Sequence, residues 1–528
     1  MTRAATAQQA WLARAALEHA HFAAACRDPQ AAQQAILQGQ LFRAEDSRFA
    51  REHGLRSGMR VEDFRRAVPV RSSDELQPWI QAAWSGEKQV LSRDPLRAFE
   101  FTSGSTGPAR LVPFSRSSHR EIRRAVLAWL ADAARRHPAA FRGSAYWSIS
   151  PLARTPQISP SGHPVGFGDD AACLDPQARL LLQATLSVPA SLALCPELES
   201  ALDATLLFLL LDPDLSFISV WNPSFLELLL QRGSRDEIRH VLIHGKAPAG
   251  LPPICANQVQ QRLNQAERRR RVLEILRSPQ IDCRRLWPRL ALVSCWGDAS
   301  AAADQERLRR LLPGIAFESK GLMATEGITS LPFGEGPGCP LALRSHFLEF
   351  RDDSGACHLA HQLELGRRYE TILSTGAGLL RCASGDLVEV VGFTGKNPRI
   401  RFLGRLGGVC DLRGEKLSPA FVQQVLDQVR LDDWAFASLC PAPGPAYCLL
   451  LEGTIPHDLA ERLEAALRTN PHYAWCRDLG QLGPLEILPC RPGTTERHRA
   501  ELLRRGLRLG DIKASPLERD PAWREILP

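Results

Sequence analysis

The chain has 528 residues, of which 44% are apolar and 23% are charged, and this composition excludes an intrinsically disordered protein. Its length allows a large core and favours more than one domain. The net charge of +7 is spread along the chain, and one dense run, Arg268 to Arg271, lies in a helical pattern without interleaved aromatic residues. A solvated helix face explains this run better than a nucleic-acid-binding patch, so we expect no nucleic-acid partner.

Signals for export, membrane insertion or metal binding are weak. The N-terminus lacks the basic and then apolar layout of a signal peptide. The most apolar run, residues 204–211, is far shorter than the roughly 20 residues of a membrane span. The fourteen cysteines are scattered without zinc-ligand spacing. We therefore expect a cytoplasmic protein with reduced thiols and no membrane span.

The pattern of the chain changes twice. Residues 1–95 read as helices, and from about residue 96 short apolar runs alternate with helical segments, which predicts an α/β fold with a largely parallel sheet. Beyond about residue 360 the runs alternate like antiparallel strands. After "LGRLGG" a compact α+β pattern begins, so we predict a domain boundary near residue 405, with domains of residues 1–404 and 405–528.

The stretch "FTSGSTGPARLVPFS", residues 101–115, has the composition of either a flexible linker or a phosphate-binding loop. Gly104 and Gly107 flank Ser105 and Thr106, and such glycines let backbone N–H groups converge on an anion. The stretch matches neither the Walker loop nor the dinucleotide fingerprint. Taken alone, both interpretations stay open.

Four features further along the chain could complete a nucleotide site. Thr325 and Glu326 lie between apolar flanks, and a carboxylate there could bind the Mg²⁺ that accompanies a nucleotide. Asp386, in a predicted turn between two strands, could accept the hydroxyls of a ribose. Arg405 lies at the predicted boundary, followed by two glycines that suit a hinge, and Lys513 is one of only six lysines. Each feature alone has an ordinary structural explanation.

Together and in this order, the motifs resemble those of the adenylate-forming (acyl-CoA synthetase-like) superfamily. Within it, the chain is most similar to the auxin-responsive Gretchen Hagen family of acyl acid amido synthetases, including its bacterial branch. The stretches that carry the likeness are "VPVRSSDELQPWI", "TSGSTG", "CWGDASA", "KGLMATEGITSLP", "YETILSTGAGLLRCASGDLVEVVGF" and "RLGDIK". The resemblance covers nearly the whole chain. It implies a large N-terminal domain of mixed sheets and helices with a small β-subdomain, and a smaller, mobile α+β C-terminal domain.

The resemblance also implies an activity. In such enzymes the carboxylate of an acid attacks the α-phosphorus of ATP, which gives an acyl-adenylate and pyrophosphate. An amine or amino acid then attacks the acyl carbon, and AMP leaves. Transfer to a thiol, of coenzyme A or a carrier protein, is the alternative. A non-catalytic ligand-binding relative is a more distant one.

Site residues follow from the resemblance by position. Lys513, Thr325 and Arg405 would take part in catalysis, and Glu326 would bind Mg²⁺. The residues implied to contact ATP are Thr102, Ser103, Gly104, Ser105, Thr106, Gly107, Trp296, Gly297, Asp298, Ala299, Ala324, Thr325, Asp386 and Arg405. Trp147 and Trp221 are candidate walls of the acyl site, although core aromatics are the commoner interpretation. The chain departs from the family pattern at three positions where aromatic residues are usual, Met323, Leu380 and Cys382.

Overall fold

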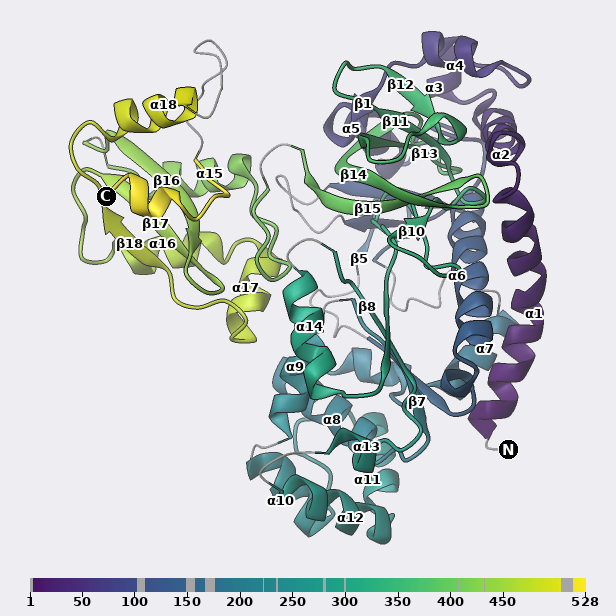
Figure 1. Cartoon of the computed structure of the whole chain (residues 1–528), viewed down its shortest axis with the longest axis vertical. Coiled ribbons are helices and arrows are strands. Elements are labelled where there is room, and N and C mark those ends of the chain that lie inside the picture. The colour runs from purple at the N-terminus through teal and green to yellow at the C-terminus, as the bar shows by residue number, and fades with distance from the viewer. Residues whose placement is uncertain are drawn as a thin grey trace. The chain divides into compact units, whose positions relative to one another are not determined.

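The computed structural model describes residues 3–101, 110–148, 157–166, 176–221, 223–233, 236–278, 282–298, 301–406, 409–431, 433–504 and 516–528. The chain forms two compact units. One comprises Met1–Glu100 and Leu111–Gly404, and the other comprises Phe101–Arg110 and Arg405–Pro528. Both units contain helices and strands, in agreement with the predicted fold class (Figure 1).

The first unit begins with helices, as the sequence predicts. These are α1 (Arg3–Ala25), α2 (Pro29–Ala44), α3 (Arg48–His53), α4 (Val61–Ala67) and α5 (Ser73–Trp84). Ser72 caps α5, because its hydroxyl accepts the Glu75 N–H while the Glu75 carboxylate accepts the Ser72 N–H. The long α1 runs beside α6 (Arg116–Arg136), and apolar residues of both helices share one core (Figure 1).

A four-stranded sheet at the centre of the first unit is parallel throughout. Its strands, in spatial order, are β4 (Ser144–Trp147), β7 (Leu215–Ser219), β8 (Leu292–Cys295) and β9 (Ala316–Ser319). The helices between these strands are α7 (Pro176–Thr185), α8 (Leu198–Leu210), α9 (Pro223–Arg232), α10 (Asp236–His244), α11 (Pro253–Leu263), α12 (Ala266–Leu276), α13 (Cys283–Leu286) and α14 (Ala301–Leu311). The alternation of short apolar runs and helices therefore predicts this part of the fold correctly.

Two sequence features of these helices have clear outcomes. The apolar run at 204–211 is buried, mostly within α8, and among the described residues no helix is both long and apolar enough to cross a membrane. The arginine run in α12 is only partly a solvated face. Arg268 is half-buried and donates to the backbone oxygens of Leu210 and Leu286 at 2.7 and 2.5 Å. These are the last residues of α8 and α13, so Arg268 satisfies carbonyl groups at the C-terminal ends of both helices.

A seven-stranded sheet follows in the chain. Its order is β10 (Cys339–Pro340), β15 (Asn397–Arg405), β14 (Cys382–Thr394), β13 (Arg368–Ser374), β11 (Phe347–Arg351) and β12 (Cys357–Leu359), with β1 (Arg71–Ser72) parallel to β14. The pair β13–β14 is antiparallel, as the alternation beyond residue 360 predicts, and the pair β11–β13 is antiparallel as well. A smaller sheet has the order β3 (Leu111–Ser115), β2 (Leu96–Phe101), β6 (Pro164–Val165) and β5 (Gln157–Ile158).

The second unit is an α+β arrangement around one three-stranded sheet. Strands β16 (Phe436–Ala442) and β17 (Ala446–Glu452) are antiparallel, and β18 (Glu486–Pro489) is parallel to β17. Its helices are α15 (Pro419–Val429), α16 (Leu459–Leu467), α17 (Pro471–Asp478), α18 (Thr494–Arg504) and α19 (Trp523–Ile526). Apolar residues from these helices and strands form its core.

Candidate active site

The carboxyl ends of the four parallel strands place several predicted residues at one edge of the sheet. Trp147 is the last residue of β4, Trp221 follows β7, Trp296 follows β8, and Lys320 follows β9. In open parallel sheets this edge is the usual place for ligands. The Trp296 N–H donates to the Trp221 backbone oxygen at 2.8 Å, so the segments after β7 and β8 stay together beyond the strands.

Lys320 lies at this edge between two indole rings. Its ammonium donates to Ser219 Oγ at 2.8 Å and lies 4.7 Å from the ring centroid of Trp129 and 5.0 Å from that of Trp221. Trp129 in turn lies 6.1 Å from Trp147. The lysine is 4% exposed, whereas Trp221 is 48% exposed. Aromatic faces stabilise a cation that has left water, so the four side chains form one unit, named here the tryptophan–lysine cluster.

Residues 296–298, the described part of the segment Trp296–Ala299 that is implied to contact ATP, connect the parallel sheet to β15. The ring centroids of Trp296 and Phe402 lie 5.6 Å apart, and the Asp298 carboxylate accepts a hydrogen bond from the Phe402 N–H at 3.2 Å. Burial raises the pKa of Asp298, although the Phe402 N–H and the charge of Arg401 act in the opposite direction. A Cβ at Gly297 would lie 2.3 Å from Ser319 Oγ, so a side chain there would force Ser319 and Gln305 to move.

Thr325 and Glu326 form the tip of a two-residue hairpin. The backbones of Ala324 and Gly327 exchange both hydrogen bonds, at 2.9 and 3.1 Å, and Met323 pairs with Ile328 just outside them. Within the described part of the chain, the side chains of Thr325 and Glu326 are half-buried and make no hydrogen bond or ion pair. An uncommitted hydroxyl and carboxylate therefore lie side by side on a tightly held turn.

Asp386 lies within a strand, which corrects the prediction that it occupies a turn between two strands. In the β13–β14 pair Glu370 faces Leu387 and Ile372 faces Ala383. Thr371 is therefore the single residue of β13 opposite residues 384–386 of β14. This bulge includes Gly385, whose φ of 75° suits glycine, and the sequence pattern "SGD" is therefore a bulge signal. Asp386 is 2% exposed, and its N–H donates to Ser384 Oγ at 3.1 Å.

The neighbouring departures from the family pattern are core positions. Leu380 and Cys382 are buried, and Met323 packs against the core shared by α1 and α6. Arg381 is a structural residue, because its guanidinium donates to Glu349 at 2.9 and 3.1 Å and to the Val68 backbone oxygen at 2.8 Å.

Several predicted residues cannot be placed. Thr102, Ser103, Gly104, Ser105, Thr106, Gly107, Ala299 and Lys513 lie outside the described residues. Arg405 is the last residue of β15, and only its backbone is described. The residues brought together at the sheet edge are those at 296–298, the hairpin after β9, and the tryptophan–lysine cluster. Sequence reasoning identified only part of that cluster, missing Trp129 and Lys320.

Family models match along the chain in the order of its domains. The GH3 family N-terminal domain matches residues 18–317, the GH3 family central domain matches residues 340–405, and the GH3 family C-terminal domain matches residues 421–522. The chain belongs to the GH3 family. The predicted resemblance to the Gretchen Hagen family is confirmed at this level.

Curated GH3 relatives match over part of their length. A mouse GH3 domain-containing protein is 29% identical over 240 residues, which are 40% of this chain and 45% of that protein. The indole-3-acetic acid-amido synthetase GH3.8 of Oryza sativa subsp. indica is 28% identical over 187 residues, 31% of each chain. The chain thus spans less than half the length of the curated relatives named here.

Solved structures extend the GH3 likeness across the fold. A GH3.15 acyl acid amido synthetase has a TM-score of 0.64 at 16% identity, and the match covers 95% of this chain and 93% of that one. A second structure of this synthetase, in complex with 2,4-DB, gives a TM-score of 0.66 at 16% identity over 99% and 96% of the two chains. This likeness establishes the fold.

Proposed function

We propose that the protein is an ATP-dependent ligase that converts a carboxylic acid into its acyl-adenylate and then into an amide. An acid carboxylate oxygen attacks the α-phosphorus of ATP, the bond from that phosphorus to the bridging oxygen breaks, and pyrophosphate leaves. The nitrogen of an amine or amino acid then attacks the acyl carbon, loses a proton, and displaces AMP. Transfer to a thiol remains the second candidate.

One observation carries the proposal. The hairpin tip holds the uncommitted hydroxyl of Thr325 and carboxylate of Glu326, next to the carboxyl edge of a parallel sheet in a GH3 chain. Adenylation needs cations and hydrogen-bond donors that neutralise phosphate charge, and it needs no protein nucleophile. In this proposal the Thr325 hydroxyl contacts the α-phosphate, and residues 296–299 border the adenine.

The chemistry of the hairpin fits a magnesium ion. Mg²⁺ is usually held by one or two carboxylates together with substrate phosphates, and it keeps several waters. Among the described residues no group of three or more His, Cys, Asp or Glu could hold a metal by itself. Glu326 with the phosphates of ATP would suffice, and the ion would supply positive charge to the leaving pyrophosphate.

The other site residues are also part of the proposal. Residues 103–107 would hold the β- and γ-phosphates, Asp386 the ribose hydroxyls, and Arg405 the ribose or a phosphate. Lys513, on a C-terminal lid domain of residues 405–528, would contact the α-phosphate and the acid during adenylation. The tryptophan–lysine cluster would border the acid.

Trapping with hydroxylamine tests the reaction. A panel of carboxylic acids is incubated with ATP, Mg²⁺ and hydroxylamine, and hydroxamate, pyrophosphate and AMP are measured. AMP and pyrophosphate are expected in equal amounts, whereas formation of ADP would exclude an adenylate. Repeating active reactions with amino acids or coenzyme A, followed by mass spectrometry, separates amide from thioester. Lys513→Ala should lower the rate about tenfold to a few hundredfold, with ATP binding largely retained.

A further inference from the structure

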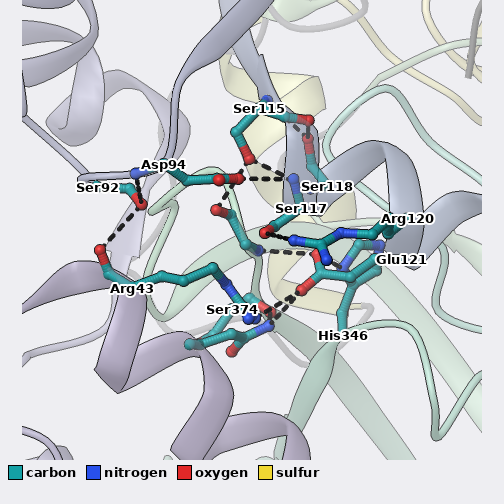
Figure 2. A network of polar contacts seen from close by, with 12 residues as sticks. Arg43, Ser92, Asp94, Ser115, Ser117, Ser118, Arg120, Glu121, His346 and Ser374 are labelled. Carbon is teal, nitrogen blue, oxygen red and sulfur yellow. Dashed lines mark hydrogen bonds and ion pairs between the residues drawn. The ribbon is translucent and has the colours of Figure 1, made fainter.

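A buried carboxylate, Glu121, has no role in the site described above. It occupies the second turn of α6 and is 3% exposed. Figure 2 shows the polar contacts that converge on it. Glu121 Oε2 accepts the Gly376 N–H at 2.8 Å and lies 3.1 Å from His346 Nδ1. Glu121 Oε1 lies 3.4 Å from Gln40 Nε2 and 3.5 Å from Arg43 Nη2.

His346 connects this carboxylate to the hairpin. Since a carboxylate only accepts, we assign the proton of the hydrogen bond to His346 Nδ1. The ring is 1% exposed, and within the described residues its Nε2 has no hydrogen-bond partner. A Cβ at Gly327 would lie 2.8 Å from that Nε2. The imidazole therefore packs directly on the glycine that closes the Thr325–Glu326 hairpin.

Gly376 connects the same carboxylate to the strand that carries Asp386. It lies in the turn between β13 and β14, where the Thr375 N–H donates to the Leu379 backbone oxygen at 2.8 Å. Its backbone oxygen accepts the Ser115 hydroxyl at 3.0 Å. A Cβ at Gly376 would lie 2.7 Å from Glu121 Oε1, so a side chain at this position would push against the carboxylate.

Three backbone segments thus meet at the pair formed by Glu121 and His346. They are the start of α6, which directly follows β3, the hairpin with Thr325 and Glu326, and the turn that leads to Asp386. We propose that Glu121 and His346 are positioning residues, which hold these three segments in the register that binds a nucleoside triphosphate. The identity of the ligand rests on the proposed function, whereas the positioning rests on the contacts alone.

The chemistry of the contacts favours positioning over simple packing. An apolar side chain of similar volume would fill the same space without the cost of burying a charge. A carboxylate that accepts from several donors instead fixes the direction and distance of each donor. Removing the carboxylate would leave these buried donors without a hydrogen-bond partner. Both glycines, Gly327 and Gly376, allow the backbone to approach the pair closely.

Glu121→Gln is the first test. The glutamine amide has nearly the same shape as the carboxylate. Its NH2 group, however, donates hydrogen bonds and would face groups that are themselves donors. Hydrogen exchange by mass spectrometry should show faster exchange in residues 322–331 and 375–380 than in the wild type. In equilibrium binding the variant should hold Mg-ATP at least tenfold more weakly. In steady-state kinetics the KM for ATP should rise while the KM for the acid stays within twofold.

A matched control is Asp212→Asn. Asp212 is also a buried carboxylate of this unit, 2% exposed, and it accepts the Ser144 hydroxyl at 2.6 Å at the amino ends of the parallel strands. This variant should lose stability without changing ATP affinity. Equal exchange and equal affinity in Glu121→Gln and wild type would overturn the proposal.

His346 variants keep the proposal testable if Glu121→Gln does not fold. Asn places an amide nitrogen near the position of Nδ1 and should retain ATP binding close to the wild type, whereas Leu should weaken it about tenfold. Equal binding by both variants would contradict a positioning role. If the wild type binds no ATP while hydrogen exchange changes as expected, the proposed function fails and the positioning of the three segments stands.

Discussion

The carboxylate of Asp298 accepts the backbone N–H of Phe402 at 3.2 Å, which joins the segment after β8 to the strand β15. Asp298→Ala removes this bond, and one hydrogen bond contributes about 1 kcal/mol of stability. We expect that loss in urea unfolding, together with weaker ATP binding. Asp298→Asn retains an acceptor oxygen and avoids the buried charge, so it should lie closer to the wild type. Equal losses in both variants would contradict this role.

Gly297→Ala should destabilise the protein. Alanine would bring a Cβ to 2.3 Å from Ser319 Oγ and 2.5 Å from Gln305 Nε2. Overpacking of this kind costs about 1–3 kcal/mol, which denaturant unfolding would measure. The control is Gly392→Ala, where the nearest atom lies at 3.8 Å and the change should stay within about 0.5 kcal/mol.

Trp221→Ala should separate acid binding from ATP binding. If the tryptophan–lysine cluster borders the acid, the KM for the acid should rise about tenfold while the KM for ATP hardly changes. Phe42→Ala is the control, since Phe42 is 57% exposed and also lies under a cation, with Arg93 at 4.2 Å. A rise in the KM for the acid in both variants, or in neither, would remove Trp221 from the acyl site.

The second unit should lose stability as pH rises through the mildly acidic range. Burial and the nearby charge of Asp411 raise the pKa of Glu415 to about 7 from an ordinary 4.5, against hydrogen bonds from Tyr447 and Leu412. Between these values the native state binds the proton and the unfolded state does not, so the free energy of unfolding falls with rising pH, by at most about 3 kcal/mol.

Glu415→Gln isolates this effect. The neutral side chain cannot lose a proton, so its unfolding free energy should fall less between pH 5 and about 7 than that of the wild type. Urea unfolding at several pH values measures the difference. Parallel curves for the two proteins would show that Glu415 titrates normally.

Periodic segments predicted the fold well, because strand and helix repeats are local properties of the chain. The spacing of apolar residues and the flanking glycines predict the strands β8, β13 and β14. The prediction that Asp386 lies in a turn is wrong for a physical reason. A serine and a glycine before an aspartate signal a turn and a bulge equally well, and only the partner strand decides between them.

Side chains that act through distant partners left no local signal. Glu121 is one of many acidic residues on amphipathic helices, and its partners lie up to 255 residues away. Lys320 could have been found, because the chain has only six lysines and this one follows a short apolar strand. Its position between two indole rings, however, depends on residues about 100 and 190 positions earlier, which no local pattern connects.

The spacing of the Glu121 partners sets an order for folding during synthesis. Gln40 and Arg43 are made before Glu121, whereas His346 and Gly376 leave the ribosome 225 and 255 residues after it. Until they arrive, the carboxylate must stay hydrated, because enclosing it without its donors would be too costly. Glu121 therefore gains its full set of partners only when about seventy per cent of the chain has been translated, and a nascent chain stalled before that point would lack the assembled contacts.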